Sequence, residues 1–138
     1  MEREDFIVDN ENTDDNYKCY HLKQDIKIFG RKISIEDDVD IEINISVNED
    51  IEKLLGLLNE YFEYLSDCKE QLVDYILSET QEDLPCLWFE DLGIISISIT
   101  VNSTEDYGAV ISVDDDYLGH ILELYFDKTE IEDCILVG

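Results

Sequence analysis

The chain is 138 residues long, and its 36 acidic residues against 9 Lys and Arg give a formal net charge of -27. A surface this negative repels nucleic-acid phosphates and anionic lipid headgroups, which argues against direct binding to nucleic acid or membrane. A hydrophobic share of 44% with 8 Tyr and 5 Phe argues against a disordered acidic chain and indicates one folded domain over residues 1–138. The charge serves either a basic partner or solubility, and composition leaves both open.

The first 24 residues are ambiguous. Phe6-Ile7-Val8 predicts a short strand, the acidic run from Asp9 to Asn16 a loop or a mobile segment, and residues 17–21 alternate weakly. Residues 26–35 alternate on both sides of a glycine, which predicts a hairpin. Residues 41–47 alternate isoleucine or valine with polar residues and predict a strand whose acidic face meets solvent.

Two helices are expected next. Asn48 is a good N-cap, and the acids after it lie at the positive end of a helix dipole. Apolar residues then recur at helical spacing from Ile51 to Leu65. Ser66 or Asp67 is expected to cap a second helix, and a link this short makes the pair antiparallel or steeply bent. Trp88 is expected to anchor the core where the helices meet the sheet.

The stretch from Ile94 to Val101 is the clearest strand of the chain. Its apolar residues are separated by single Ser or Thr residues, so one face is expected to be buried. These apolar residues are Ile95, Ile97, Ile99 and Val101. Three further strands follow, at residues 109–113, 119–126 and 134–137, joined by short links. The predicted fold class is α+β: an antiparallel sheet, made of the N-terminal hairpin plus a C-terminal four-strand meander, with a helical pair packed on one face.

Candidate catalytic and calcium-binding residues are few. The acidic turn at residues 114–116 resembles the start of a calcium loop, but the fifth and twelfth positions hold Leu118 and Tyr125 instead of the required ligands. His120 has no Ser or Cys nucleophile motif beside it, which favours a structural role over a general base. Among 36 acids some carboxylate pair always lies close, so paired carboxylates carry no catalytic signal. We therefore predict no enzymatic activity.

The four cysteines are spread along the chain without a close pair. Cys19 and His21 lie two residues apart, but no second ligand pair completes a zinc pattern, so we expect no metal and no cofactor. No apolar run follows the N-terminal residues, and no stretch approaches the length of a membrane span. These features predict a cytoplasmic protein with free, mostly buried thiols.

Several short motifs follow one another in the second half of the chain. They are Leu72 to Leu77, Trp88, Ile94 to Val101, Asp114 to Asp116, Gly119-His120 and Ile135 to Gly138. With these motifs, roughly residues 40–138 resemble a group of bacterial domains of unknown function. Members of such groups often resemble immunity proteins encoded beside polymorphic toxins. The resemblance therefore implies a neighbouring toxin as the partner.

Charge and resemblance together predict an acidic, non-enzymatic binding protein that neutralises a basic protein, with a bacterial toxin domain as the leading candidate. The expected mechanism is occlusion of the cationic groups with which the toxin holds its substrate. Acids in exposed turns and one adjacent aromatic side chain are expected to meet this partner. They are Asp37, Asp38, Asp114, Asp115, Asp116 and Tyr117. The alternatives are a small hydrolase using His120 and nearby acids, and a nucleic-acid-mimic inhibitor.

Overall fold

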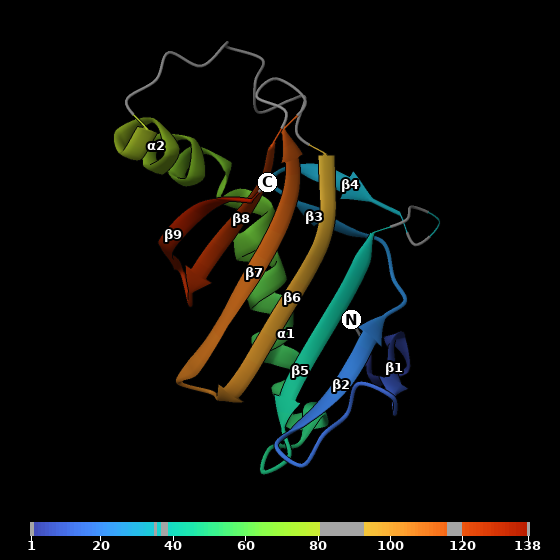
Figure 1. Ribbon diagram of the computed structural model, residues 1–138. Coiled ribbons are helices and arrows are strands. Elements are labelled where there is room, and N and C mark those ends of the chain that lie inside the picture. Colours follow the sequence, from blue (N-terminus) through green and yellow to red (C-terminus); the bar gives the residue numbers. More distant parts are fainter. Residues whose placement is uncertain (1, 35, 37–38, 81–92, 116–119, 138) are drawn as a thin grey trace.

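The computed structural model describes residues 2–34, 36, 39–80, 93–115 and 120–137 of an α+β fold (Figure 1). The strands of its main sheet are β1 (Phe6–Asp9), β2 (Tyr17–Leu22), β5 (Asp40–Ser46), β6 (Gly93–Ser103), β7 (Asp106–Asp115), β8 (His120–Asp127) and β9 (Glu130–Val137). These seven strands lie in the order β1-β2-β5-β6-β7-β8-β9. A short 3-10 helix (Arg3–Asp5) precedes β1.

Strand β6 lies in the middle of this sheet, which confirms the predicted central strand. Ile97 is 1% exposed, and Ile99 and Val101 are fully buried. Ile95 is 39% exposed, so its predicted burial is wrong. The cause is a register shift against β7 between Ile94 and Ser96, which interrupts the alternation of faces at the start of the strand.

Strands β6 to β9 form the predicted antiparallel meander, but β5 and β6 pair in parallel, with Ile43 opposite Ile99. Between β5 and β6 the chain runs through two helices, α1 (Ile51–Asp67) and α2 (Lys69–Thr80). A strand that returns through a helical crossover enters the sheet in its original direction. The expectation of a wholly antiparallel sheet is therefore wrong for this central pair.

The predicted hairpin forms as β3 (Ile26–Ile28) and β4 (Arg31–Ile33), but it makes a separate two-stranded sheet. Its turn residues Phe29 and Gly30 have φ angles of 54° and 77°, as in the tight primed turns of hairpins. Phe29 is 2% exposed, and its N–H donates to the carbonyl of Leu65 at 2.9 Å. The hairpin is thus packed against the end of α1 and does not join the main sheet.

The ambiguous N-terminal residues occupy the place expected for the hairpin. β1 pairs antiparallel with β2, and β2 pairs antiparallel with β5. Phe6, Tyr20 and Leu22 from these strands are buried in the same apolar cluster as the core of α1 and β6. Both strands are therefore part of the main sheet and its core.

Helix α1 covers one face of the main sheet (Figure 1). Its N-cap is Asp50, whose carboxylate accepts the N–H of Glu52 at 3.0 Å, so the predicted cap at Asn48 lies two residues too early. Its sheet-facing side is apolar and buried, as the helical spacing predicted. The buried residues are Ile51, Leu54, Leu58, Tyr61, Phe62 and Leu65.

Helix α2 follows α1 after the single residue Cys68 and runs beside the β9 edge of the sheet (Figure 1). The hydroxyl of Tyr75 donates to the carbonyl of Glu132 at 3.3 Å, and Leu72 is fully buried. Trp88, the predicted core anchor, lies outside the described residues. In the part of the chain that the structure describes, neither helix combines the length and the apolar character that crossing a membrane requires.

Candidate functional site

The face of the main sheet that points away from α1 is covered by none of the described elements (Figure 1). We call it the open face. The β3–β4 hairpin packs with α1 on the other face, and α2 lies along the β9 edge. Because successive side chains of a strand point to opposite faces, the strand registers determine which side chains the open face carries.

The open face is acidic. Carboxylates from five of the seven strands point to it, among them Asp9, Asp40, Glu42, Asp114, Glu123 and Asp133. The one Lys or Arg within the described residues of the main sheet is Lys18, which lies with Tyr20 on the α1 side. Charge is therefore segregated between the two faces of the sheet.

Apolar side chains lie among the acids at the β8–β9 end of the open face. Ile121 and Ile135 are 41% and 42% exposed, and Ile121 pairs with Asp114 while Ile135 pairs with Glu123. The hydroxyl of Tyr125 donates to the Glu123 carboxylate at 2.5 Å, which raises the pKa of Tyr125. We call these five residues the β8 patch, where apolar area and negative charge alternate from strand to strand.

The centre of the open face is rich in hydroxyl groups and holds a hollow. Ser98 and Thr100 of β6 border a shallow hollow of about 220 Å³ above Gly108. A Cβ at Gly108 would lie 2.5 Å from the carbonyl oxygen of Phe126, so the two strands approach too closely there for any other residue. The sequence pattern of β6 predicted the hydroxyl row, but the hollow depends on how β7 and β8 pair.

The opposite end of the open face holds a cluster of titratable side chains around His21. Its Nε2 lies 2.6 Å from Oδ2 of Asp9, and its Nδ1 lies 3.1 Å from Oδ1 of Asp40. The two contacts thus place a carboxylate oxygen at each nitrogen of the ring. The hydrogen bond from His21, followed by one from Asn12, lowers the pKa of Asp9 to about 2.

Cys19 lies next to this histidine and is fully buried. Its thiol donates to Oε1 of Glu42 at 3.0 Å, and its backbone N–H donates to Oγ1 of Thr13 at 3.0 Å. Burial, and then the hydrogen bond to Glu42, raise the pKa of the Cys19 thiol to about 12. A thiol of this kind is not an activated nucleophile, so the arrangement does not resemble a Cys–His catalytic pair.

Asp9, Cys19, His21, Asp40 and Glu42 together form what we call the His21 cluster. The ligand atoms of its first three members all lie within 4.8 Å of one another. The sequence showed the spacing of Cys19 and His21 but not their proximity to Asp9. That proximity follows from the register of β1 on β2, which sets Asp9 opposite Cys19.

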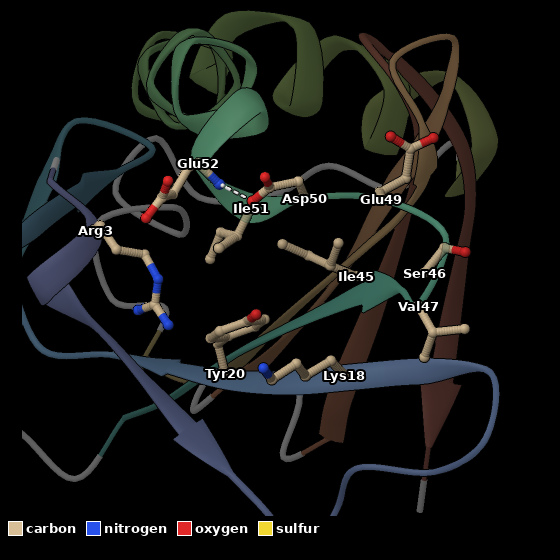
Figure 2. A pocket seen from close by; sticks show the side chains of 10 residues that line it. All are labelled: Arg3, Lys18, Tyr20, Ile45, Ser46, Val47, Glu49, Asp50, Ile51 and Glu52. Carbon is tan, nitrogen blue, oxygen red and sulfur yellow. Dashed lines mark hydrogen bonds between the residues drawn. The ribbon is translucent and has the colours of Figure 1, made fainter.

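A second hollow, of about 340 Å³, lies on the α1 side of the sheet near the start of the helix (Figure 2). Figure 2 shows Arg3 and Lys18 beside the ring of Tyr20, and their charged groups lie 5.3 and 5.7 Å from its centroid. Asp50 and Glu52 line the wall formed by α1. Both signs of charge meet here, so this hollow has no single sign of charge with which to select a ligand.

The residues predicted to meet a partner are only partly described. Asp114 is exposed on the open face, in the β8 patch region, opposite Ile121. Asp115 is the last residue of β7 and pairs with His120 at the start of β8. The other predicted contact residues lie outside the described residues, and their role stays a prediction. They are Asp37, Asp38, Asp116 and Tyr117.

Comparisons of the chain with protein-family models, with curated proteins and with solved structures gave no match. The resemblance of residues 40–138 to immunity-like domains therefore stays a prediction.

Proposed function

We propose that this chain is an acidic, non-enzymatic binding protein that holds a basic protein on its open face and neutralises it by occlusion. The observation that supports this most directly is the segregation of charge on the main sheet. Carboxylates from five strands point to the open face, and Lys18, the one Lys or Arg in the described strands of the main sheet, points the other way. Such a surface attracts a cationic protein and repels nucleic acid.

The size of the open face suits a protein partner. Seven strands spaced about 4.8 Å apart span about 29 Å, and an eight-residue strand such as β8 is about 26 Å long. The resulting area of about 750 Å² is close to the roughly 800 Å² that each partner buries in a standard interface. A small ligand would need a deeper cavity than the shallow hollow above Gly108.

The partner class that we propose is a bacterial toxin domain that acts on nucleic acid. Such a domain holds phosphates with Lys and Arg, and these are the groups that an acidic face covers. The resemblance to immunity-like domains supports this choice of partner. Within the interface, Tyr125, Ile121 and Ile135 would supply desolvated contact area, while the surrounding acids would steer the approach.

The test is stopped-flow association, at several salt concentrations, with the C-terminal domain encoded by the neighbouring reading frame. A face variant and a control variant each remove three negative charges, so their net charges are equal. The face variant carries Asp114→Asn, Glu123→Gln and Asp133→Asn. The control variant carries Glu60→Gln, Glu63→Gln and Asp67→Asn, which are exposed on α1.

We expect the face variant to associate about 10-fold more slowly at low salt, with a flatter salt dependence, and the control variant to change little. Ile121→Ala and Tyr125→Ala should mainly speed dissociation. Equal slowing by both triple variants would mean that the charge acts only as a diffuse field and that the open face is not the interface. A neighbouring domain that does not bind at all would refute the toxin assignment.

A further inference from the structure

We propose that the His21 cluster is a zinc site in which Asp9, Cys19 and His21 are ligands. Cys19 and His21 point to the same side of β2, and the β1–β2 register brings Asp9 opposite Cys19. Their ligand atoms lie within 4.8 Å of one another. Ligands of a tetrahedral zinc ion, with bonds of about 2.0–2.3 Å, lie about 3.3–3.8 Å apart. Small side-chain rotations therefore suffice to form the site.

The mixture of donors selects the metal. One sulfur, one imidazole nitrogen and one carboxylate oxygen suit zinc, whereas calcium and magnesium are bound by oxygen alone. Glu42 offers the fourth ligand, because its Oε1 lies 3.0 Å from the sulfur of Cys19 and its strand position is opposite His21. Four protein ligands make a closed, structural type of site.

A second observation, independent of the donor atoms, comes from the far side of the imidazole ring. Oδ1 of Asp40 lies 3.1 Å from Nδ1 of His21, so it orients the ring with Nε2 toward Asp9. Histidines that bind metals almost always donate their other ring N–H to a carboxylate or carbonyl in this way. Asp40 is therefore a positioning residue for the metal ligand.

The solvent exposure of the ligand side chains, and the effect that a bound ion would have on the strands, also fit a metal site. The side chains of His21 and Asp9 are 27% and 18% exposed toward the open face, while Cys19 is fully buried beneath them. An ion entering from this face would replace the thiol proton that Cys19 donates to Glu42 and would bind Nε2 of His21, and every proton displaced from these ligand atoms would pass to solvent. It would also tie β1 and β2 to β5 and reduce the repulsion among the carboxylates.

Zinc titration of the reduced, metal-free chain tests the proposal directly. Excess calcium and magnesium should be present, so that weak association with exposed acids is saturated. We expect one zinc ion per chain with a Kd below about 1 µM. Cobalt in place of zinc should give a thiolate-to-metal charge-transfer band that Cys19→Ser abolishes and Cys134→Ser, in β9, leaves unchanged.

Substitutions separate the ligands from the positioning residue. His21→Gln and Asp9→Asn should weaken zinc about 100-fold or more, Asp40→Asn about 10–100-fold, and the control Glu60→Gln not at all. Circular dichroism checks that each variant is folded. The proposal is overturned if the wild-type chain binds no stoichiometric zinc, or if bound zinc is insensitive to His21→Gln and Asp9→Asn. The assignment does not depend on the toxin partner, and the partner assay can fail without affecting it.

Discussion

Alanine substitutions at Ile97 and Ile95 test the register on which the open face depends. The two residues lie on the same strand, and Ile97 is 1% exposed whereas Ile95 is 39% exposed. A slip of β6 by one residue would turn its hydroxyl row into the core and its isoleucines outward. The two variants therefore make the same Ile-to-Ala change at one buried and one partly exposed position, and the register of β6 determines which position is which.

The expected cost follows from burial. Each substitution removes three carbon atoms, and at about 0.8 kcal/mol per buried methylene the loss at Ile97 is about 2.4 kcal/mol. Ile97 faces Ile41 on β5 and Ile111 on β7, so a cavity remains and brings the cost to about 3.5 kcal/mol. At Ile95 the buried share is smaller and solvent fills the space, so the cost is about 1–1.5 kcal/mol.

Urea unfolding followed by circular dichroism measures both values. With a stability of about 5–15 kcal/mol for a domain of this size, both variants should remain folded in buffer. We expect the Ile97→Ala midpoint to fall by more than twice as much as the Ile95→Ala midpoint, at an unchanged slope. Equal losses, or a larger loss at Ile95, would refute the register and with it the assignment of acids to the open face.

Three further substitutions test other features of the fold. Gly108→Ala should destabilise the chain by about 1–3 kcal/mol in urea unfolding, since its Cβ would lie 2.5 Å from the main-chain oxygen of Phe126; wild-type stability would contradict this close approach. Tyr61→Phe should raise stability by about 1 kcal/mol in the same assay, because the buried hydroxyl has no hydrogen-bond partner among the described residues, and a loss would mean that one exists. The carboxylate of Asp14 accepts backbone N–H groups, chiefly that of Tyr17, which lower its pKa below 3.8. The ionised carboxylate therefore stabilises the fold above pH 3.8, and this contribution is lost as pH falls through the lowered pKa. The difference in unfolding free energy between wild type and Asp14→Asn should shrink over this pH range. A difference that does not change with pH would disprove this role.

The candidate sites differ in how far the sequence could predict them. The spacing of Cys19 and His21 was visible, but Asp9 lies ten residues before Cys19 in a run that predicted only a loop or a mobile segment. Asp40 and Glu42 belong to a third strand, and they reach the cluster only because β5 pairs with β2. Metal sites are recognised in a sequence by short spacings between ligands, and ligands that come from three separate strands have no such spacing.

Local periodicity by itself determined the existence of β5 and β6 and the apolar stripe of α1, although Val47, predicted to end the first of these strands, lies beyond β5 and is exposed. It also determined the acidic, hydroxyl-rich character of the strand faces, because alternation and helical spacing are properties of neighbouring residues. Tertiary structure alone decided that β5 and β6 run in parallel, that the hairpin stands apart, and that β1 and β2 complete the sheet. It also decided which face α1 covers. These choices depend on pairing and packing between residues far apart in the chain, whose free energies no local pattern contains.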